Sequence, residues 1–228
     1  MSILGLVMLA DILTEYNLLD HVASDIGVDQ LYFPAQGLQT QINLDKIALW
    51  TEDNLMRLKE SKTTYILFTR SGANFTTRLT LNDKFIERQN YIKLLGVWLQ
   101  PDVGWGKHIK ETSKKAYIRL GFLSKLRYAG IDRRELIHNY KQFVRTALEY
   151  CSVAYHSSLT EAQSNTLERC QAVALRIILQ EDYETYSSAL TLTSLDRLST
   201  RRTSRCLDFS LNVLRMRRTA DSSQQIQT

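Results

Sequence analysis

The sequence predicts an α+β fold, in which one amphipathic helix and a few strands come first and a helical bundle follows. Three observations support this. A run of four large apolar residues at 65–68 is typical of a buried strand. After the glycines at 104 and 106, apolar residues recur at the three- and four-residue spacing of an α-helix. Proline, which interrupts helices, occurs only at positions 34 and 101, so long helices are allowed in the second half.

The first part of the chain mixes helix and strand signals. Pro34 and Gly37 indicate a turn or loop, and Asn82-Asp83 indicates a hairpin, because both residues tolerate a positive φ. The apolar segment at 2–10 fits either a buried strand or the start of a helix. One helix is expected at 41–59, and strands are expected at 64–69, 77–81, 84–87 and 91–99.

The second part predicts four helices, at about 107–128, 132–155, 160–178 and 195–215. Two of them have a polar residue placed to accept from the first backbone N–H groups: Asp132 with Glu135 three residues on, and Thr160 with Gln163. The polar end of the chain is expected to be disordered. The change from the first part to the second falls near 101–106.

The charge changes at the same place. Residues 1–106 have 9 basic and 12 acidic side chains, whereas residues 107–228 have 20 basic and 12 acidic ones. A basic half suggests an acidic partner, with nucleic acid first and a membrane surface second, although solvated helix faces explain the charge equally well. No stretch approaches the ~18 apolar residues of a membrane span, so no membrane partner is expected.

The residues alone do not support an independent catalyst. The chain has no glycine-rich phosphate loop and no close cluster of histidines and cysteines; its histidines are scattered at 21, 108, 138 and 156. Its three cysteines, at 151, 170 and 206, are too far apart in sequence for a zinc or redox motif, which favours reduced thiols in an intracellular protein. No metal ligand set is predicted.

Nucleic-acid binding has better support, from a basic stretch at 107–134 that contains nine basic and two acidic residues. Lys107, Lys110, Lys114 and Lys115 recur along one side of the expected helix. Trp105, Tyr117 and Tyr128 lie between the basic residues and suit contact with sugars or bases. The alternative is an ordinary charged face. The candidate nucleic-acid-binding residues are Lys107, Lys110, Lys114, Lys115, Arg119, Lys125 and Arg127.

A second basic group follows near the end of the chain, at Arg197, Arg201, Arg202 and Arg205. Spacings of four and three place three of these guanidinium groups on one side of a helix. Ion pairs with Glu161 or Glu168 explain the group equally well.

Several motifs resemble those of the reverse transcriptases of non-LTR retrotransposons. Residues 54–68 are similar to the helix-to-strand element that follows the catalytic site in that family, with a Leu-Asn-x-x-Lys-Thr pattern and then an apolar strand. The matching residues are Leu58, Lys62, Thr63 and Phe68, and Lys59 replaces the usual asparagine.

The resemblance continues in the family's order over about residues 40–212. The next element has a Leu-Gly-Val turn and a Trp-x-x-His-Ile signature, matched by Leu95, Gly96, Val97, Asp102, Trp105, His108 and Ile109. Three further segments match at Val144, Arg145, Leu148, Glu149, Tyr150 and Tyr155, at Leu167, Glu168, Gln171, Leu175 and Arg176, and at Leu195, Leu198, Arg201, Arg202, Arg205 and Phe209. The family more often has tryptophan at the position of Tyr155.

The resemblance implies a domain organisation. Residues 1–103 would be the C-terminal portion of the polymerase palm, 104–216 a helical thumb-like domain, and 217–228 a disordered tail. Met1–Ala10 resembles the strand that follows the family's catalytic Asp-Asp turn, so the chain is expected to begin after that turn.

The resemblance also implies what this chain lacks. The family's catalytic aspartates hold two Mg²⁺ ions for nucleotidyl transfer, and this chain has no Asp-Asp dipeptide. The chain alone is therefore expected to be inactive and to hold no cofactor. By the same resemblance Lys62 would lie near the incoming nucleotide, unless it is only a charge at a helix end, and Leu95, Gly96 and Val97 would form a turn against the primer.

Two functions are expected from different classes. In the first, the chain is a fragment of a reverse transcriptase that binds an RNA–DNA or DNA duplex without sequence preference. In the second, it is a helical structural or interaction protein that self-associates through exposed apolar faces, or a degraded element copy with no selected function.

Overall fold

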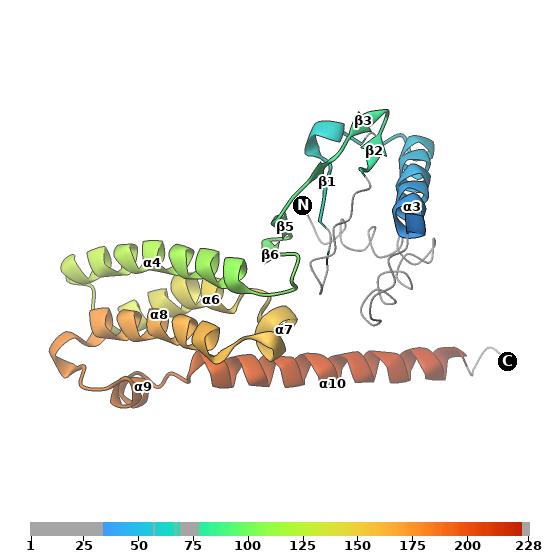
Figure 1. The fold of residues 1–228 in the computed structure, drawn as a ribbon. Helices are drawn as coiled ribbons and strands as arrows, with labels where there is room; N and C mark the ends of the chain where they lie inside the picture. The colour runs from blue at the N-terminus through green and yellow to red at the C-terminus, as the bar shows by residue number, and fades with distance from the viewer. Residues whose placement is uncertain (1–33, 57, 67, 69–77, 225–228) are drawn as a thin grey trace. The chain divides into compact units, whose positions relative to one another are not determined.

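The computed structural model describes residues 34–56, 58–66, 68 and 78–224, and the chain is mostly helical with a few short strands (Figure 1). It divides into two compact units. Unit 1 comprises residues up to 96 together with 100–103, and unit 2 comprises 97–99 and 104–228. The expected segment at 2–10 lies outside the described residues.

The described part of unit 1 contains one long helix, one 3₁₀ turn and short strands. The helices are α3 (Pro34–Asp53) and η1 (Glu60–Lys62), and the strands are β1 (Thr64–Tyr65), β2 (Thr80–Leu81), β3 (Lys84–Phe85), β4 (Glu87–Arg88) and β5 (Ile92–Leu94). The prediction of a turn at Pro34 is wrong, because Pro34 is the first residue of α3. Proline is well tolerated there, since its missing N–H would have no partner in the first turn of a helix.

The hairpin around Asn82-Asp83 is confirmed. Strands β2 and β3 pair antiparallel, with Thr80 opposite Phe85, and both turn residues have a positive φ of 50° and 60°. The side-chain amide of Gln41 on α3 bonds both backbone groups of Thr80 at 2.9 Å and so fastens the helix to the free edge of β2. Leu79, Leu81 and Ile86 form the buried cluster of this unit.

Of the described residues in the buried strand expected at 64–69, Thr64 and Tyr65 form a strand, which pairs in parallel with β4. Ile66 and Phe68 lie outside that strand, and Phe68 is 48% exposed. The strand expected at 91–99 is a hairpin instead, since β5 and β6 (Val97–Leu99) are separated by a turn. Leu95 and Gly96, with φ of 48° and 91°, form that turn.

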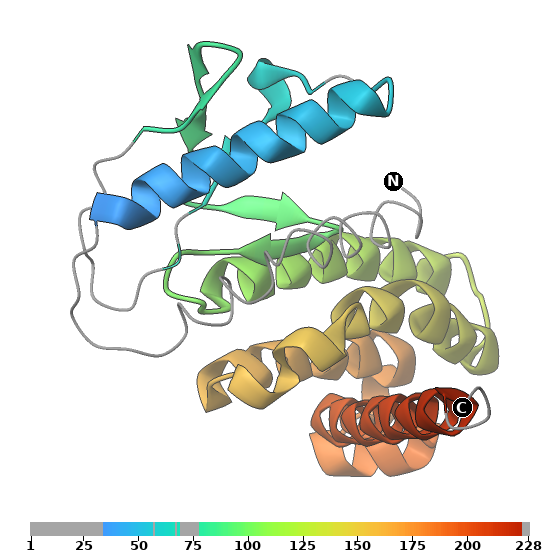
Figure 2. The same cartoon turned by 90° about the vertical axis from the view of Figure 1, so that its right-hand side faces the viewer.

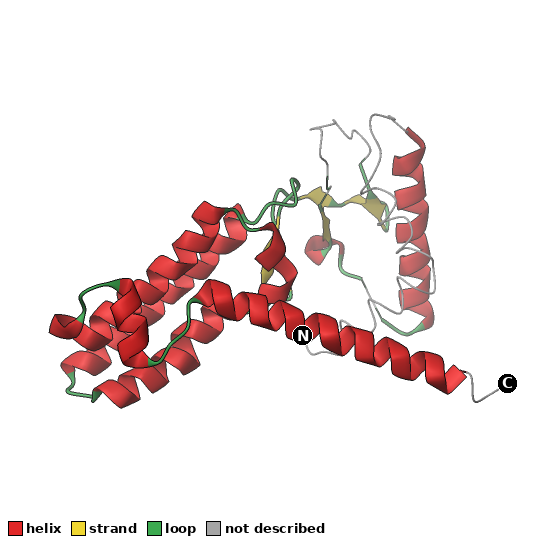
Figure 3. Cartoon of the chain, turned by 90° about the horizontal axis from the view of Figure 1, so that it is seen from below, coloured by secondary structure: helices red, strands yellow, loops and turns green. Residues whose placement is uncertain are grey.

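Unit 2 is almost entirely helical (Figure 3). Besides β6 it contains α4 (Gly106–Tyr128), α5 (Arg133–Asn139), the π-helix η2 (Tyr140–Arg145), α6 (Thr146–Glu149), α7 (Ser152–Tyr155), η3 (His156–Ser158), α8 (Glu161–Leu179), η4 (Gln180–Asp182), α9 (Tyr186–Thr193) and α10 (Leu198–Gln224). Helix α4 packs most extensively on α8, and the α5–α6 segment lies against both, as Figures 1 and 2 show.

Two helix starts in unit 2 are confirmed. Asp132 accepts from the N–H of Glu135 at 2.9 Å, and Thr160 and Gln163 form a reciprocal capping box. The helix expected over 132–155 is interrupted, however. Cys151 adopts a left-handed φ of 52°, so the chain turns there and starts again as α7.

Two further differences concern the last third of the chain. Helix α9 lies between the helices expected at 160–178 and 195–215, where no helix is predicted from the sequence. Its capping box has Thr185 as the N-cap residue and Ser188 at the position where glutamate or glutamine is usual. Helix α10 runs through residues 217–224 of the expected tail, and 225–228 lie outside the described residues.

Candidate nucleic-acid interface

Helix α4 has one buried side and one exposed side. The buried side includes Ile109, Ala116, Leu120 and Leu123, which join the core of unit 2. Positions three and four apart share a side of a helix, so the residues between them are left for solvent. Lys110, Lys114, Lys115 and Lys125 are all exposed.

Three of these lysines carry charge that no described carboxylate neutralises directly. Within the described part of the chain, Lys110, Lys114 and Lys115 make no ion pair. The pKa of Glu111 is lowered by its hydrogen bond from Lys107 and by the charges of Lys107, Lys114 and Lys110. The exposed side of α4 is therefore positive along its first half.

The remaining candidate cations make contacts within the protein. Lys107 donates to Glu111 at 3.0 Å and lies 5.0 Å from the centroid of the Trp98 ring. Arg119 donates to the carbonyl of Phe143, and Arg127 donates to Gln180 Oε1 at 2.7 Å. These contacts tie α4 to β6, η2 and η4.

Exposed apolar and aromatic side chains lie among the lysines. Tyr117 is 49% exposed, Phe122 53% and Tyr128 90%; Ile118 is exposed as well. Phe122 and Ile118 were not predicted as surface residues, although the helical period places both opposite the buried side. The surface formed by Lys110, Lys114, Lys115, Lys125 and these four side chains is called the α4 face below.

Trp105 is not part of this face, which corrects the expectation that it contacts nucleic acid. It is buried, donates from Nε1 to Ser158 Oγ at 2.6 Å, and packs with His108 and Tyr155 at centroid distances of 6.0 and 5.8 Å. Its large apolar ring stabilises the corner where α4 meets α7.

His108, the other polar member of the Trp-x-x-His-Ile signature, is buried in the same corner. Its Nδ1 accepts from the N–H of Trp98 at 3.3 Å, and its ring lies 5.0 Å from that of Tyr155. Burial, and secondarily the charge of Lys115, lower the pKa of His108. The signature is thus a packing motif in this structure.

The second arginine group is engaged with a carboxylate that the sequence did not suggest. Arg201 donates to Glu149 at 2.5 and 3.2 Å, and Arg205 lies 3.4 Å from the same carboxylate. The expected partners Glu161 and Glu168 form none of the ion pairs among the described residues. Arg202 is fully buried and donates to Ser164 Oγ at 2.7 Å.

Glu168 and Gln171 bind the start of α10 to α8. Glu168 accepts from the N–H groups of Leu198 and Ser199 at 3.3 and 2.7 Å, which caps α10. Gln171 is fully buried; it donates to the carbonyl of Asp196 at 2.9 Å and accepts from the hydroxyl of Tyr140 at 2.5 Å. Glu149 and Gln171 stand out in the sequence only as matching residues, because their partners are 15 or more positions away.

The residues expected near a nucleotide or primer lie in η1 and around the β5–β6 turn. Lys62 is the last residue of η1, and its side chain is outside the described part of the chain. Leu95 and Gly96 form the β5–β6 turn, whereas Val97 is buried in the core of unit 2.

Among the described residues, no group of three or more histidine, cysteine, aspartate or glutamate side chains is arranged to hold a metal ion. None of the described helices is both long enough and apolar enough to cross a bilayer. Comparison of the chain with protein-family models, with curated proteins and with solved structures found no match.

Proposed function

We propose that this chain is the C-terminal part of a non-LTR retrotransposon reverse transcriptase and that it binds an RNA–DNA or DNA duplex without sequence preference through the α4 face. The observation that carries the binding proposal is a row of exposed lysines that form no ion pair with any described carboxylate and lie beside exposed aromatic rings. Lysines neutralise phosphates, and aromatic faces suit sugars and bases.

The assignment to the family is supported by what the matching residues do. Trp105, His108 and Tyr155 come from two separate motifs and pack on one another. Glu149 pairs with Arg201 and Arg205, which belong to another matching segment. Residues that the resemblance selects along the chain are therefore mutual partners, as expected if the likeness reflects one folded unit.

The proposal assigns binding and no chemistry to this chain. Mg²⁺-dependent nucleotidyl transfer belongs to the family's Asp-Asp site, and the described residues supply no comparable carboxylate group. The nucleic acid is therefore proposed as the partner of the thumb-like unit 2.

The test is a binding titration of a 20-base-pair RNA–DNA hybrid, followed by fluorescence anisotropy between 50 and 300 mM KCl. Replacing Lys110, Lys114 and Lys115 by glutamine should weaken binding at least tenfold at low salt. It should also reduce the slope of log K against log salt by about three, since each neutralised phosphate contributes roughly 0.9.

A matched control removes three exposed cations from unit 1, in the variant K46Q/K84Q/R88Q, and has the same change of net charge. This control should bind as the wild type does. If both triple variants weaken binding equally, the effect is one of net charge and the α4 face is not the binding site. Unchanged binding by the α4 variant would also rule out the α4 face.

A second candidate function has one specific observation in its favour. On α10, Leu207 and Leu211 lie on one side of the helix and are 60% and 52% exposed, and Phe209 on the opposite side is 55% exposed. A protein-interaction role would bury them. Sedimentation equilibrium of the wild type and of L207S/F209S/L211S tests it: self-association that the variant abolishes would favour this role, and a monomer at all concentrations would argue against self-association.

A further inference from the structure

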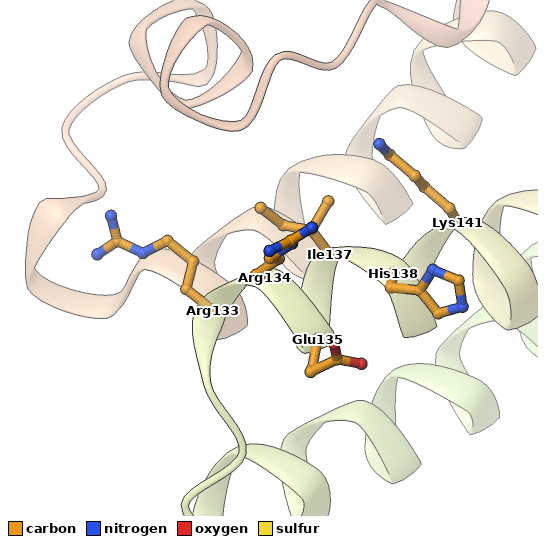
Figure 4. Close-up of a pocket in the computed structure, with 6 residues that line it drawn as sticks. All are labelled: Arg133, Arg134, Glu135, Ile137, His138 and Lys141. Carbon is orange, nitrogen blue, oxygen red and sulfur yellow. The ribbon is translucent and has the colours of Figure 1, made fainter.

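A second row of basic residues lies along the α5–η2 segment. Arg134, His138, Lys141 and Arg145 follow one another at spacings of four, three and four, which places them on one side of the helix. An open pocket of about 490 Å³ is lined by Arg133, Arg134, Glu135, Ile137, His138 and Lys141 (Figure 4). Glu135 is its one acidic residue, and Arg133 is already paired with Asp182.

The far end of this row has more positive charge than its carboxylate can neutralise. Glu149 is 2% exposed and is bound by Arg201 at 2.5 Å and by Arg205 at 3.4 Å. Arg145 lies close to these three charged groups. Burial and the charges of Arg201 and Arg205 lower the pKa of Arg145, whereas the charge of Glu149 raises it. Two guanidinium groups thus bind the carboxylate of Glu149 and a third lies near them, while the charge of Asp196 also acts on Arg201, so basic side chains outnumber acidic ones at this end of the row.

This row faces away from the α4 face. Helix α4 reaches η2 through Arg119, which donates to the carbonyl of Phe143. Lys141 and Arg145 are each two positions from Phe143, and residues two apart lie on nearly opposite sides of a helix. The row along α5 and η2 is therefore a separate surface.

We propose that Arg134, His138, Lys141, Arg145, Arg201 and Arg205 form a second binding surface, for the phosphodiester backbone of a nucleic acid. The row from Arg134 to Arg145 extends for about 16 Å, at 1.5 Å per residue, which suits a series of phosphates better than a single anion. Phosphates would supply the negative charge that Glu149 alone does not. The residues that line the pocket include no phenylalanine, tyrosine or tryptophan, so we expect contacts with the phosphate backbone rather than stacking on bases.

The experiment measures binding of a 25-base-pair DNA duplex by the full chain between 50 and 300 mM KCl. R134Q/K141Q and K141Q/R145Q should each reduce the salt slope by about two, at 0.9 per phosphate. The first variant leaves the surroundings of Glu149 intact, so it tests the surface even if the second unfolds. K46Q/K84Q is the control with the same loss of charge and should keep the wild-type slope.

Comparison with K110Q/K114Q/K115Q separates this surface from the α4 face. Additive losses of slope in the combined variant support two surfaces. If neither R134Q/K141Q nor K141Q/R145Q changes the slope, the second surface is overturned and the proposal for the α4 face is unaffected. If these two variants reduce the slope and K110Q/K114Q/K115Q does not, only the second surface is supported. If these variants weakened binding to phosphatidylserine vesicles but not to DNA, the assignment to nucleic acid would be overturned.

Discussion

Several buried polar residues in unit 2, Gln171 and Glu149 among them, are held by partners distant in sequence. Gln171 uses both its carbonyl and its amide group, the latter bonding the hydroxyl of Tyr186 at 3.0 Å in addition to Asp196. A buried polar group without partners costs about 1–3 kcal/mol, so each such side chain favours one arrangement of helices over others. At this scale the sequence predicts which residues are polar, but not which partner each one takes.

The buried imidazole of His108 should make the stability of unit 2 sensitive to mild acid. Its pKa is lowered in the folded protein, so the unfolded chain binds more protons once the pH falls below about 6.5. The free energy of unfolding should therefore be largest above that pH and should decrease as the pH falls toward the folded pKa. His156, whose pKa is lowered by burial and by Arg202, contributes in the same direction.

Urea unfolding at pH 7.5 and 5.5 measures this effect. H108Q should be less stable than the wild type at pH 7.5 but should lose less stability on acidification, because glutamine can accept from Trp98 and does not titrate. H138Q, at an exposed histidine, is the control and should lose as much as the wild type does. Equal losses by H108Q and the wild type would show that another group titrates.

Helix ends were the most predictable elements, because their signals are local. Asp132, Thr160 and the Asn82-Asp83 turn each need only the next three residues to form their bonds. The break at Cys151 and the π-helix η2 have no such signal, since tertiary packing, and not propensity, selects them. Helix α9 was missed because eight residues are too few to establish a period.

Gly121, inside α4, and Gly130, just after it, should respond to alanine in opposite directions. Gly130 ends α4 with a φ of 81°, whereas Gly121 lies inside the helix; an added Cβ meets nothing within 4 Å at either site. G121A should stabilise the protein by about 0.5–1 kcal/mol, because alanine favours the helix. G130A should destabilise it by about 1 kcal/mol, because the left-handed backbone strains an L-residue.

Thermal unfolding of the two variants against the wild type checks this pair. Since neither site is crowded, backbone conformation is the main difference between them. A stabilised G130A would mean that the end of α4 can relax without cost.

For the whole molecule, the two units differ in the core that the described residues provide. Unit 2 has a continuous cluster that draws on most of its helices, whereas the buried hydrophobic residues of unit 1 are Leu79, Leu81 and Ile86. Burial of apolar area is the main stabilising contribution to folding, so the described part of unit 1 should open more readily.

Hydrogen–deuterium exchange with mass spectrometry should show this difference. Amides of α8 and of the centre of α4 should exchange most slowly, and those of α3 faster by at least an order of magnitude. The core variant L175A should accelerate exchange in α8 without changing α3. Equal protection of α3 and α8 would contradict the difference between the units.

The candidate site could be predicted only in part from the sequence. Clusters of lysine and arginine are visible in it, and so is the helix that displays Lys110 and Lys114. It does not distinguish these from Lys107, which bonds Glu111, because side-chain contacts depend on the folded neighbours. Trp105 illustrates the same limit: an aromatic residue in a basic stretch turned out to be part of the core.

The π-helical turn of η2 sets the rotational phase of the segment around it. Leu136, Tyr140, Val144 and Leu148 are all buried and recur every four residues, whereas a 3.6-residue helix would rotate each by about 40° relative to the one before. The wider turn takes up this rotation, so one side of the segment stays inward over its whole length. Deleting one residue from η2 would restore a regular helix and turn Glu149 away from Arg201, so the extra residue maintains the alignment of α6 with α10.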